Sequence, residues 1–231
     1  MSGKEKWFLW VDGKRDPYLN MAVDELLLER SASFGRPVLR IYGWDRPSVS
    51  IGYVQNFGAA PAEGYAVVRR PTGGGVVFHD VDLTYTVVVP EGNFITGLNR
   101  VESYHVLHRA VLRMFKAFGR TGALAEMDQP VPDRATMQCF TTPTRYDVLL
   151  DGRKHAGSAQ RRTKNGILHQ GRISLLAGAG DESLLVERLV DAFEQELALE
   201  FERFEPDSAF MEAARNLAAG KYATDEWNKS K

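Results

Sequence analysis

The chain has 231 residues, of which 44% are hydrophobic and 26% are charged, a composition typical of a globular protein. Its 29 lysine and arginine residues nearly balance 30 aspartate and glutamate residues, so no bulk charge favours nucleic acid or a membrane surface. No apolar run approaches the roughly 18 residues of a membrane helix, and the single cysteine excludes an internal disulfide. We therefore expect a cytoplasmic protein with one domain over residues 1–231, including a short polar tail from about residue 221.

The first third of the chain predicts a strand, a helix and then several short strands. Trp7–Val11 is a strand candidate that ends at a turn around Asp12 and Gly13. Asp16 and Pro17 then suit the N-cap and first turn of a helix of about 15 residues. Runs of β-branched and aromatic residues, separated by turn-forming residues, predict four strands: Val38–Tyr42, Ser48–Tyr53, Ala66–Arg69 and Thr84–Val89.

The rest of the chain predicts a long helix, a hairpin, a further strand and two C-terminal helices. The helix and the hairpin comprise Arg100–Phe118, a strand over Tyr146–Leu150, an Asp151-Gly152 turn and a return strand from Arg153. The later elements are a strand at Ile167–Leu176 and helices at Ser183–Leu199 and Ser208–Leu217. Because strands and helices do not alternate regularly, we expect an α+β fold with a mixed, mainly antiparallel sheet flanked by helices.

A glycine-rich turn between two predicted strands is the most informative stretch. Three successive glycines, Gly73, Gly74 and Gly75, remove every Cβ from the turn, so a ligand could approach the backbone and N–H groups could converge on an anion. The preceding arginines add positive charge, and the following His79-Asp80 pair could add polar groups. The alternative is a hairpin turn with solvated arginines. A Walker loop or a Rossmann turn is excluded because no Lys-Ser/Thr follows and strands lie on both sides.

Residues Arg69–Asp80 as a whole resemble the Arg-Arg-x-x-Gly-Gly-Gly-x-Val-Phe-His-Asp signature of the lipoate–protein ligases and octanoyltransferases. The resemblance implies a biotin/lipoate ligase-like catalytic domain whose glycine turn and neighbouring strand line a slot for an acyl chain. Strand alternation leaves open which of the residues after the turn face that slot. The residues that the resemblance assigns to the slot here are Arg70, Gly73, Gly74, Gly75, Val76, Phe78 and His79.

A second stretch, Asp147–Arg162, resembles the other signature of this family, in which a lysine follows a hairpin turn and precedes a Gly-Ser-Ala-Gln run. By that match Lys154 reaches the acyl carbonyl, where an ammonium group can stabilise an oxyanion or a thiolate. An isolated lysine beside a turn would instead be a surface residue. The match adds Gly157, Ser158 and Ala159 to the acyl-binding residues.

A third element of the family is similar to Ile167–Gly171, where His169 either lines the pocket or is a structural histidine.

The only cysteine, Cys139, is either a small buried hydrophobic residue or a nucleophile. Residues Cys139–Tyr146 resemble the Cys-Phe-x-x-Pro element of the cysteine-dependent octanoyltransferases, which carries the acyl group as a thioester. A thiolate suits this role because it is both a good nucleophile and a good leaving group. The resemblance therefore implies that Cys139 and Lys154 are catalytic.

The resemblance implies an acyltransferase that moves an octanoyl or lipoyl group from a donor carrier protein onto a lysine of a lipoyl-accepting domain. This reaction needs no metal and no ATP, because the donor thioester is already activated. One alternative is an ATP-dependent lipoate–protein ligase, which would use ATP and Mg²⁺ and work through lipoyl-adenylate. Another is a non-catalytic module that binds lipoyl groups or carriers. A biotin ligase would be expected to carry a Gly-Arg-Gly-Arg loop, which is not found.

Both signatures should meet at one elongated pocket, and the acyl slot should be polar only near Lys154, since each buried CH₂ contributes about 0.8 kcal/mol.

Overall fold

The computed structural model describes residues 3–60, 63–127, 143–175 and 181–231. In these ranges no helix combines the length and the apolar character that crossing a membrane would require. The strands are β1 (Glu5–Arg15), β2 (Val38–Trp44), β3 (Ser48–Ile51), β4 (Ala66–Arg69), β5 (Val77–His79), β6 (Asp82–Pro90), β7 (Gly122–Leu124), β8 (Val148–Leu150), β9 (Arg153–Thr163), β10 (Gly166–Ser174) and β11 (Leu199–Arg203). The helices are α1 (Pro17–Glu29), α2 (Ser31–Phe34), α3 (Phe94–Gly97), α4 (Arg100–Ala117), α5 (Glu182–Leu197), α6 (Ser208–Leu217) and α7 (Asp225–Asn228).

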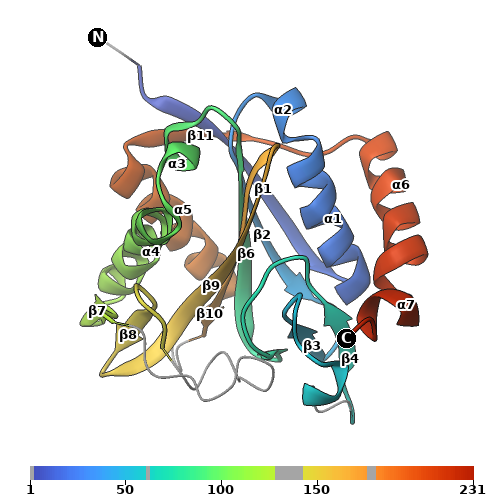
Figure 1. The fold of residues 1–231 in the computed structure, drawn as a ribbon. Helices are drawn as coiled ribbons and strands as arrows, with labels where there is room; N and C mark the ends of the chain where they lie inside the picture. The colour runs from blue at the N-terminus through green and yellow to red at the C-terminus, as the bar shows by residue number, and fades with distance from the viewer. Residues whose placement is uncertain (1–2, 61–62, 128–142, 176–180) are drawn as a thin grey trace.

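A large mixed sheet forms the centre of the molecule, with strand order β11-β1-β2-β6-β10-β9-β8-β7. The β1–β11 and β1–β2 pairs are parallel, whereas every other pair in this sheet is antiparallel. Helices α4 and α5 cover one face, and α1 and α6 cover the other (Figure 1). The predicted fold class, α+β with a mainly antiparallel sheet flanked by helices, is confirmed.

Each face of the large sheet has its own apolar core. On the α4 and α5 side, buried residues such as Tyr85, Val111 and Phe193 form one cluster. On the α1 and α6 side, Leu27, Val88 and Phe210 belong to a second cluster. This arrangement follows from strand alternation, since Val87 and Val88 of β6 contribute to opposite cores.

A second, three-stranded sheet of order β4-β3-β5 lies beside the large sheet and carries the glycine turn between β4 and β5. The C-terminal segment, which the sequence marks as a short polar tail, packs against β4. Tyr222 is fully buried, and the Trp227 indole N–H donates to the Arg69 carbonyl oxygen at 2.8 Å. The segment is therefore part of the folded body.

Two local predictions were wrong. The predicted turn at Asp12 and Gly13 is a β-bulge within β1, where the pairing register with β2 shifts between Val11 and Gly13. Gly13 adopts a φ of +75°, which a glycine accommodates and which lets the strand continue. The predicted helix end at Leu199 is instead the start of β11, because Ala198 takes a left-handed conformation that ends α5.

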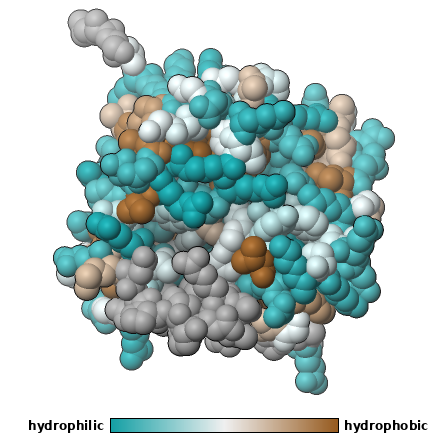
Figure 2. Space-filling model, in the orientation of Figure 1, coloured by the Kyte–Doolittle hydropathy of each residue, from teal (hydrophilic) through white to brown (hydrophobic). Residues whose placement is uncertain are grey.

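The face of the molecule in Figure 2 is mostly hydrophilic, with hydrophobic residues at separate spots.

Candidate active site

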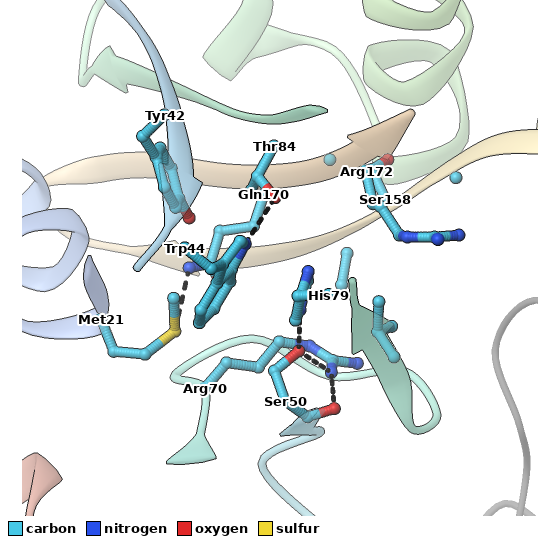
Figure 3. Close-up of a pocket in the computed structure, with 14 residues that line it drawn as sticks. Met21, Tyr42, Trp44, Ser50, Arg70, His79, Thr84, Ser158, Gln170 and Arg172 are labelled. Atoms are coloured by element: carbon cyan, nitrogen blue, oxygen red, sulfur yellow. Dashed lines mark hydrogen bonds between the residues drawn. The ribbon is translucent and has the colours of Figure 1, made fainter. Parts of the chain in front are cut away.

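A cavity between the two sheets collects residues from both signature stretches (Figure 3). It holds about 450 Å³ of space including its open mouth. Helix α1, strand β2 and the small sheet with its turn contribute Met21, Tyr42, Trp44, Ser50, Arg70 and His79. Strands β9 and β10 contribute Gly157, Ser158, Ala159, Gln170 and Arg172. The two stretches that the sequence singles out thus meet at one place.

The Arg70 guanidinium group stabilises the glycine turn through hydrogen bonds to its carbonyl oxygens. Its Nη2 donates to the carbonyl oxygens of Gly73 and Gly75 at 2.6 and 2.7 Å, and its Nε donates to Gly73 at 3.0 Å. Gly74 has a φ of +86°, in the left-handed region that favours glycine. The arginine therefore shapes the turn, in addition to placing positive charge at the cavity.

Arg69 has a different role from its neighbour. Its side chain is buried and donates to the backbone oxygens of Gln55 and Asn228 at 2.6 and 2.7 Å. It therefore joins the loop after β3 to the C-terminal segment.

His79 is held between a carboxylate and a hydroxyl group. Its Nδ1 lies 2.8 Å from Asp82 Oδ2, and its Nε2 lies 2.9 Å from Ser50 Oγ. The Trp44 ring stacks on the imidazole with the ring centroids 3.9 Å apart. Burial lowers the pKa of His79, although Asp82 opposes this shift. The partner of the histidine is thus Asp82, whereas the neighbouring Asp80 is exposed and accepts a hydrogen bond from Tyr65.

The residues after the glycine turn, whose orientation the sequence left open, divide between the cavity and the core of the small sheet. Val77 and His79 line the cavity, whereas Val76 is buried in the core of the small sheet and Phe78 packs against that core. Alternation along β5 explains the difference, because placing His79 toward the cavity turns Phe78 away from it. Val76 and Phe78 are therefore turned away from a ligand in this cavity.

Lys154 lies beneath Gly157 and forms a buried ion pair with Asp147. The Lys154 Nζ is 2.7 Å from Asp147 Oδ2, and the two side chains are only 2% and 1% exposed. Asp147 Oδ2 also accepts hydrogen bonds from the Thr144 backbone N–H and hydroxyl at 2.6 and 3.0 Å. A Cβ on Gly157 would be 2.7 Å from the Lys154 Nζ, so the glycine leaves the space that the ammonium group occupies next to the cavity wall. Lys154 is thus a positioned buried cation and not a surface lysine.

His108, on α4, was not among the predicted site residues. It is fully buried, with its Nδ1 2.6 Å from the Tyr146 carbonyl oxygen and its Nε2 2.6 Å from Ser158 Oγ. The sequence carries one weak signal, a histidine between the apolar residues Leu107 and Val111 of an amphipathic helix. That signal does not distinguish a structural histidine from a functional one.

His169 lies away from the cavity lining. It is fully buried, with its Nδ1 3.0 Å from Gln160 Nε2 and its Nε2 3.4 Å from the Tyr85 hydroxyl group. On β10 the neighbouring Gln170 faces the cavity, so His169 points to the other face of the sheet. His169 therefore lies on the face away from the cavity and bonds to other protein groups, as a structural histidine does.

The cavity lining is mostly apolar, as expected of an acyl slot, but its polar groups are not confined to the neighbourhood of Lys154. Arg70, His79 and Gln170 also line the cavity, together with apolar groups such as Met21 and Val77. The polar groups are bonded to other protein groups. Gln170, for example, accepts from the Thr72 hydroxyl and donates to Asp24, each at 2.7 Å. Such pairing removes most of the cost of placing polar side chains beside an apolar ligand.

Cys139 lies outside the described residues, and its assignment as nucleophile stays a prediction. Within the described part of the chain, no group of three or more His, Cys, Asp or Glu side chains is arranged to hold a metal ion.

The overall fold is shared with solved structures of lipoate–protein ligases. Lipoate-protein ligase A bound with ATP matches with a TM-score of 0.79 at 22% identity, over 97% of this chain and 98% of that one. The bi-partite lipoate protein ligase of Thermoplasma acidophilum matches with a TM-score of 0.75 at 20% identity, over 97% and 96%. At these identities the likeness shows the fold alone.

Sequence comparison identifies the family. The family model for the lipoyl protein ligase A/B catalytic domain matches residues 16–182. The octanoyltransferase LipM of Kyrpidia tusciae is 34% identical, covering 98% of this chain and all of the relative, and that of Bacillus subtilis is 31% identical, covering 97% and 98%. The chain belongs to the lipoyl protein ligase A/B catalytic domain family. The predicted enzyme class, an acyltransferase of protein lipoylation, is thereby confirmed.

Proposed function

We propose that the protein is a cytoplasmic octanoyltransferase that passes an octanoyl group from a donor carrier protein, through a thioester on Cys139, to a lysine of a lipoyl domain. The observation that carries the proposal is the buried Lys154–Asp147 pair, which lies beneath Gly157 at the wall of the cavity. The full-length relatives named octanoyltransferase support the choice of an octanoyl group. On this proposal residues 1–231 act as one catalytic domain.

The reaction has two steps. In the first, Cys139 gives up its proton, its thiolate attacks the carbonyl carbon of the donor thioester, and the carrier's thiolate leaves and takes up a proton in exchange. In the second, the acceptor lysine amine attacks the octanoyl-enzyme, the C–N bond forms, and Cys139 leaves as a thiol. Each step passes through an oxyanion, and in this proposal the Lys154 ammonium group stabilises it. Asp147 fixes the direction of that ammonium group at 2.7 Å.

The sequence connects Cys139 to this pair. The described chain resumes at Pro143, and Thr144 bonds to Asp147 Oδ2. Cys139 is therefore five residues before a residue that contacts the ion pair. A cation in its neighbourhood would favour the thiolate, which is the reactive form.

The proposed reaction has two protein partners and does not use ATP. The donor is an octanoyl-carrying protein and the acceptor is a lipoyl domain. A related fold, the Thermoplasma acidophilum ligase, is described together with its E2 lipoyl domain, which supports an acceptor of that kind. ATP is not required, because the donor thioester supplies the activated acyl group.

The first test of the function measures acyl transfer from an octanoyl-carrier protein to a lipoyl domain, with and without ATP. Mass spectrometry of the wild-type protein should show one octanoyl group that hydroxylamine removes. Cys139→Ser should abolish this adduct and lower transfer by at least about 10³-fold, because a serine hydroxyl has no accessible anionic form near neutral pH.

The second candidate function is the ATP-dependent lipoate ligase, which the fold likeness to an ATP-bound ligase favours. It predicts obligatory ATP, release of pyrophosphate and full activity of the Cys139→Ser variant. Lys154→Ala should fail under both functions. ATP-dependent activity in the Cys139→Ser variant would therefore contradict the transferase function and support the ligase function.

A further inference from the structure

Hydrogen bonds at the cavity connect a serine hydroxyl group through an imidazole to a carboxylate. Ser50 Oγ lies 2.9 Å from His79 Nε2, and His79 Nδ1 lies 2.8 Å from Asp82 Oδ2. Ser50 is buried, and the side chains of His79 and Asp82 are only 4% and 2% exposed. Ser50 and His79 both line the cavity (Figure 3). Serine, histidine and aspartate bonded in this order can activate the serine oxygen for attack on a carbonyl carbon.

The pairing of β3 with β5 directs the serine and the histidine to the same side of the small sheet. Ser50 is paired with Val77, and Ser48 with His79, in this antiparallel pair. Partners across an antiparallel pair project from the same face, and Val77 and His79 line the cavity. Val49, between the two serines, projects from the other face into the core of the small sheet. The Ser50 side chain therefore lies on the cavity side.

The carboxylate comes from the large sheet. Asp82 begins β6, and its Oδ2 also accepts from the Thr84 hydroxyl group at 3.1 Å and lies 3.4 Å from Arg172 Nε. The Trp44 indole N–H donates to Thr84 Oγ1 at 2.9 Å, and the Trp44 ring stacks on His79. The imidazole is therefore held at its edge by a carboxylate and on one face by an indole.

The hydrogen bonds place each proton where a general base needs it. The Asp82 carboxylate can only accept, so the His79 Nδ1 carries a hydrogen. In the neutral ring the Nε2 then accepts from the Ser50 hydroxyl group. Burial lowers the pKa of His79, which favours this neutral form. Asp82 opposes the pKa shift, whereas the positive charges of Arg172 and Arg70 act in the same direction as burial.

A cation adjoins the serine oxygen. Arg70 Nη1 donates to Ser50 Oγ at 3.1 Å and to the Ser50 carbonyl oxygen at 2.9 Å. The bonds from Arg70 to the carbonyl oxygens of Gly73 and Gly75 fix the guanidinium group in this position. When a serine oxygen attacks a carbonyl carbon, negative charge develops on the carbonyl oxygen beside it. A cation that is already in place there stabilises this charge.

We propose that Ser50, His79 and Asp82 form a catalytic triad that gives the protein a second activity, the hydrolysis of esters and thioesters with an apolar acyl chain. Ser50 is the nucleophile and His79 is the general base and acid. Asp82 is a positioning residue, which acts by orienting the imidazole. Apolar groups of the same cavity, such as Met21 and Val77, take the acyl chain.

The reaction has two steps, and its protons balance. Ser50 Oγ bonds to the acyl carbon as its proton passes to His79 Nε2, and the alcohol or thiol leaves with that proton. Water then attacks the acyl-serine and gives a proton to His79. The bond from the acyl carbon to Ser50 Oγ breaks, the serine takes the proton back, and the carboxylic acid is released. No step involves Cys139, so this activity goes beyond the proposed octanoyl transfer and is tested separately from it.

The test measures hydrolysis of p-nitrophenyl octanoate by the full chain carrying Cys139→Ala, in which no thioester can form at that residue. Mass spectrometry during turnover should show one octanoyl group on the peptide that contains Ser50. This oxygen ester should withstand neutral hydroxylamine, which cleaves a thioester. Adding Ser50→Ala should abolish the adduct and lower the hydrolysis rate by at least about 10³-fold, because the nucleophile is lost.

Two further variants in the same background distinguish a catalytic triad from a structural chain of hydrogen bonds. Asp82→Asn should slow hydrolysis by about 10²-fold or more, the range for loss of general base catalysis. It should also move the acid limb of the pH–rate profile to lower pH, because the carboxylate raises the pKa of His79. Ser48→Ala is the matched control. Ser48 lies on the same strand but donates to the Arg46 carbonyl oxygen, so this variant should hydrolyse the ester at the parent rate.

Urea denaturation of each variant checks that its fold is kept. Unchanged hydrolysis in Ser50→Ala, or an octanoyl group on a residue other than Ser50, would overturn the proposed triad. Equal losses of hydrolysis in Ser48→Ala and Ser50→Ala, or no hydrolysis by the Cys139→Ala chain, would overturn it as well. None of these outcomes bears on octanoyl transfer to a lipoyl domain, which the wild-type protein either performs or does not.

Discussion

At the residue scale, a substitution of Gly157 should move the Lys154 ammonium group without unfolding the protein. A Cβ at this position would lie 2.4 Å from Lys154 Cε and 2.7 Å from Lys154 Nζ. Both atoms belong to the flexible end of a side chain, so Gly157→Ala should displace the ammonium group without moving the backbone. We expect the variant to remain folded but to lose about 10²-fold in octanoyl loading, the rate at which an octanoyl-carrier protein acylates the enzyme, since a displacement of about 1 Å can cost that much.

The measurement for Gly157→Ala is the rate of octanoyl loading beside a thermal unfolding curve. Gly97→Ala is the matched control, because a Cβ at Gly97 meets no atom within 4 Å. Wild-type loading by Gly157→Ala would show that the position of the Lys154 ammonium group does not matter for the reaction.

The candidate site residues that the sequence predicted are those that belong to a signature motif. Arg70, His79 and Lys154 stand in signature stretches, and the structure brings them to one region of the molecule. The partners Asp82 and His108 were not recognised. Their roles depend on contacts between distant elements, such as the bond from α4 to Ser158 on β9, which no local pattern encodes.

At the element scale, the glycine turn depends on a glycine outside its own motif. A Cβ on Gly52, just after β3, would lie 2.0 Å from the Gly74 carbonyl oxygen. The clash is with backbone, so Gly52→Ala must push the turn away from the loop that follows β3. We expect a loss of about 1–3 kcal/mol in the free energy of unfolding, the usual cost of overpacking, together with weaker octanoyl loading.

Urea denaturation of Gly52→Ala beside Gly58→Ala tests this prediction, because the second glycine has open space where a Cβ would be. Equal stability of the two variants would mean that the contact between Gly52 and Gly74 does not constrain the turn.

Elements with a strong internal pattern were predicted well. The helix after Asp16 is capped as expected, with the Asp16 carboxylate accepting from the Tyr18 and Leu19 N–H groups, and Ser208–Leu217 has the predicted bounds. The hairpin at Asp151 and Gly152 forms with both residues at positive φ. The short strands β7 and β11 were missed. Their existence depends on pairing with β8 and β1, which lie far away in sequence.

At the scale of the whole molecule, the sequence predicts the fold class and the meeting of the two signatures, but not the role of the C-terminal segment. Residues 221–231 read as a polar tail, because Lys, Asp, Glu and Asn dominate them. In the structure Lys221 pairs with Glu25 at 2.6 Å, and Asn228 is buried, with 5% exposure. Polarity alone does not show that these groups bond to the backbone of another element.

Asn228 makes the contact by which the C-terminal segment supports the small sheet. Its Oδ1 accepts from the Arg69 N–H at 2.7 Å, and its Nδ2 donates to the Tyr222 carbonyl oxygen at 2.7 Å. Asn228→Ala would leave the buried Arg69 N–H without this acceptor, a loss that costs about 1–3 kcal/mol. We therefore expect Asn228→Ala to lower the free energy of unfolding by that amount and to speed hydrogen exchange at the β4 amides.

Lys229→Ala is the control for Asn228→Ala, since its pair with Asp225 is exposed at the surface. Because β4 leads directly into Arg70 and the glycine turn, the variant should also load octanoyl groups more slowly. If Asn228→Ala and Lys229→Ala unfold at the same urea concentration, the C-terminal segment does not stabilise the turn through Asn228.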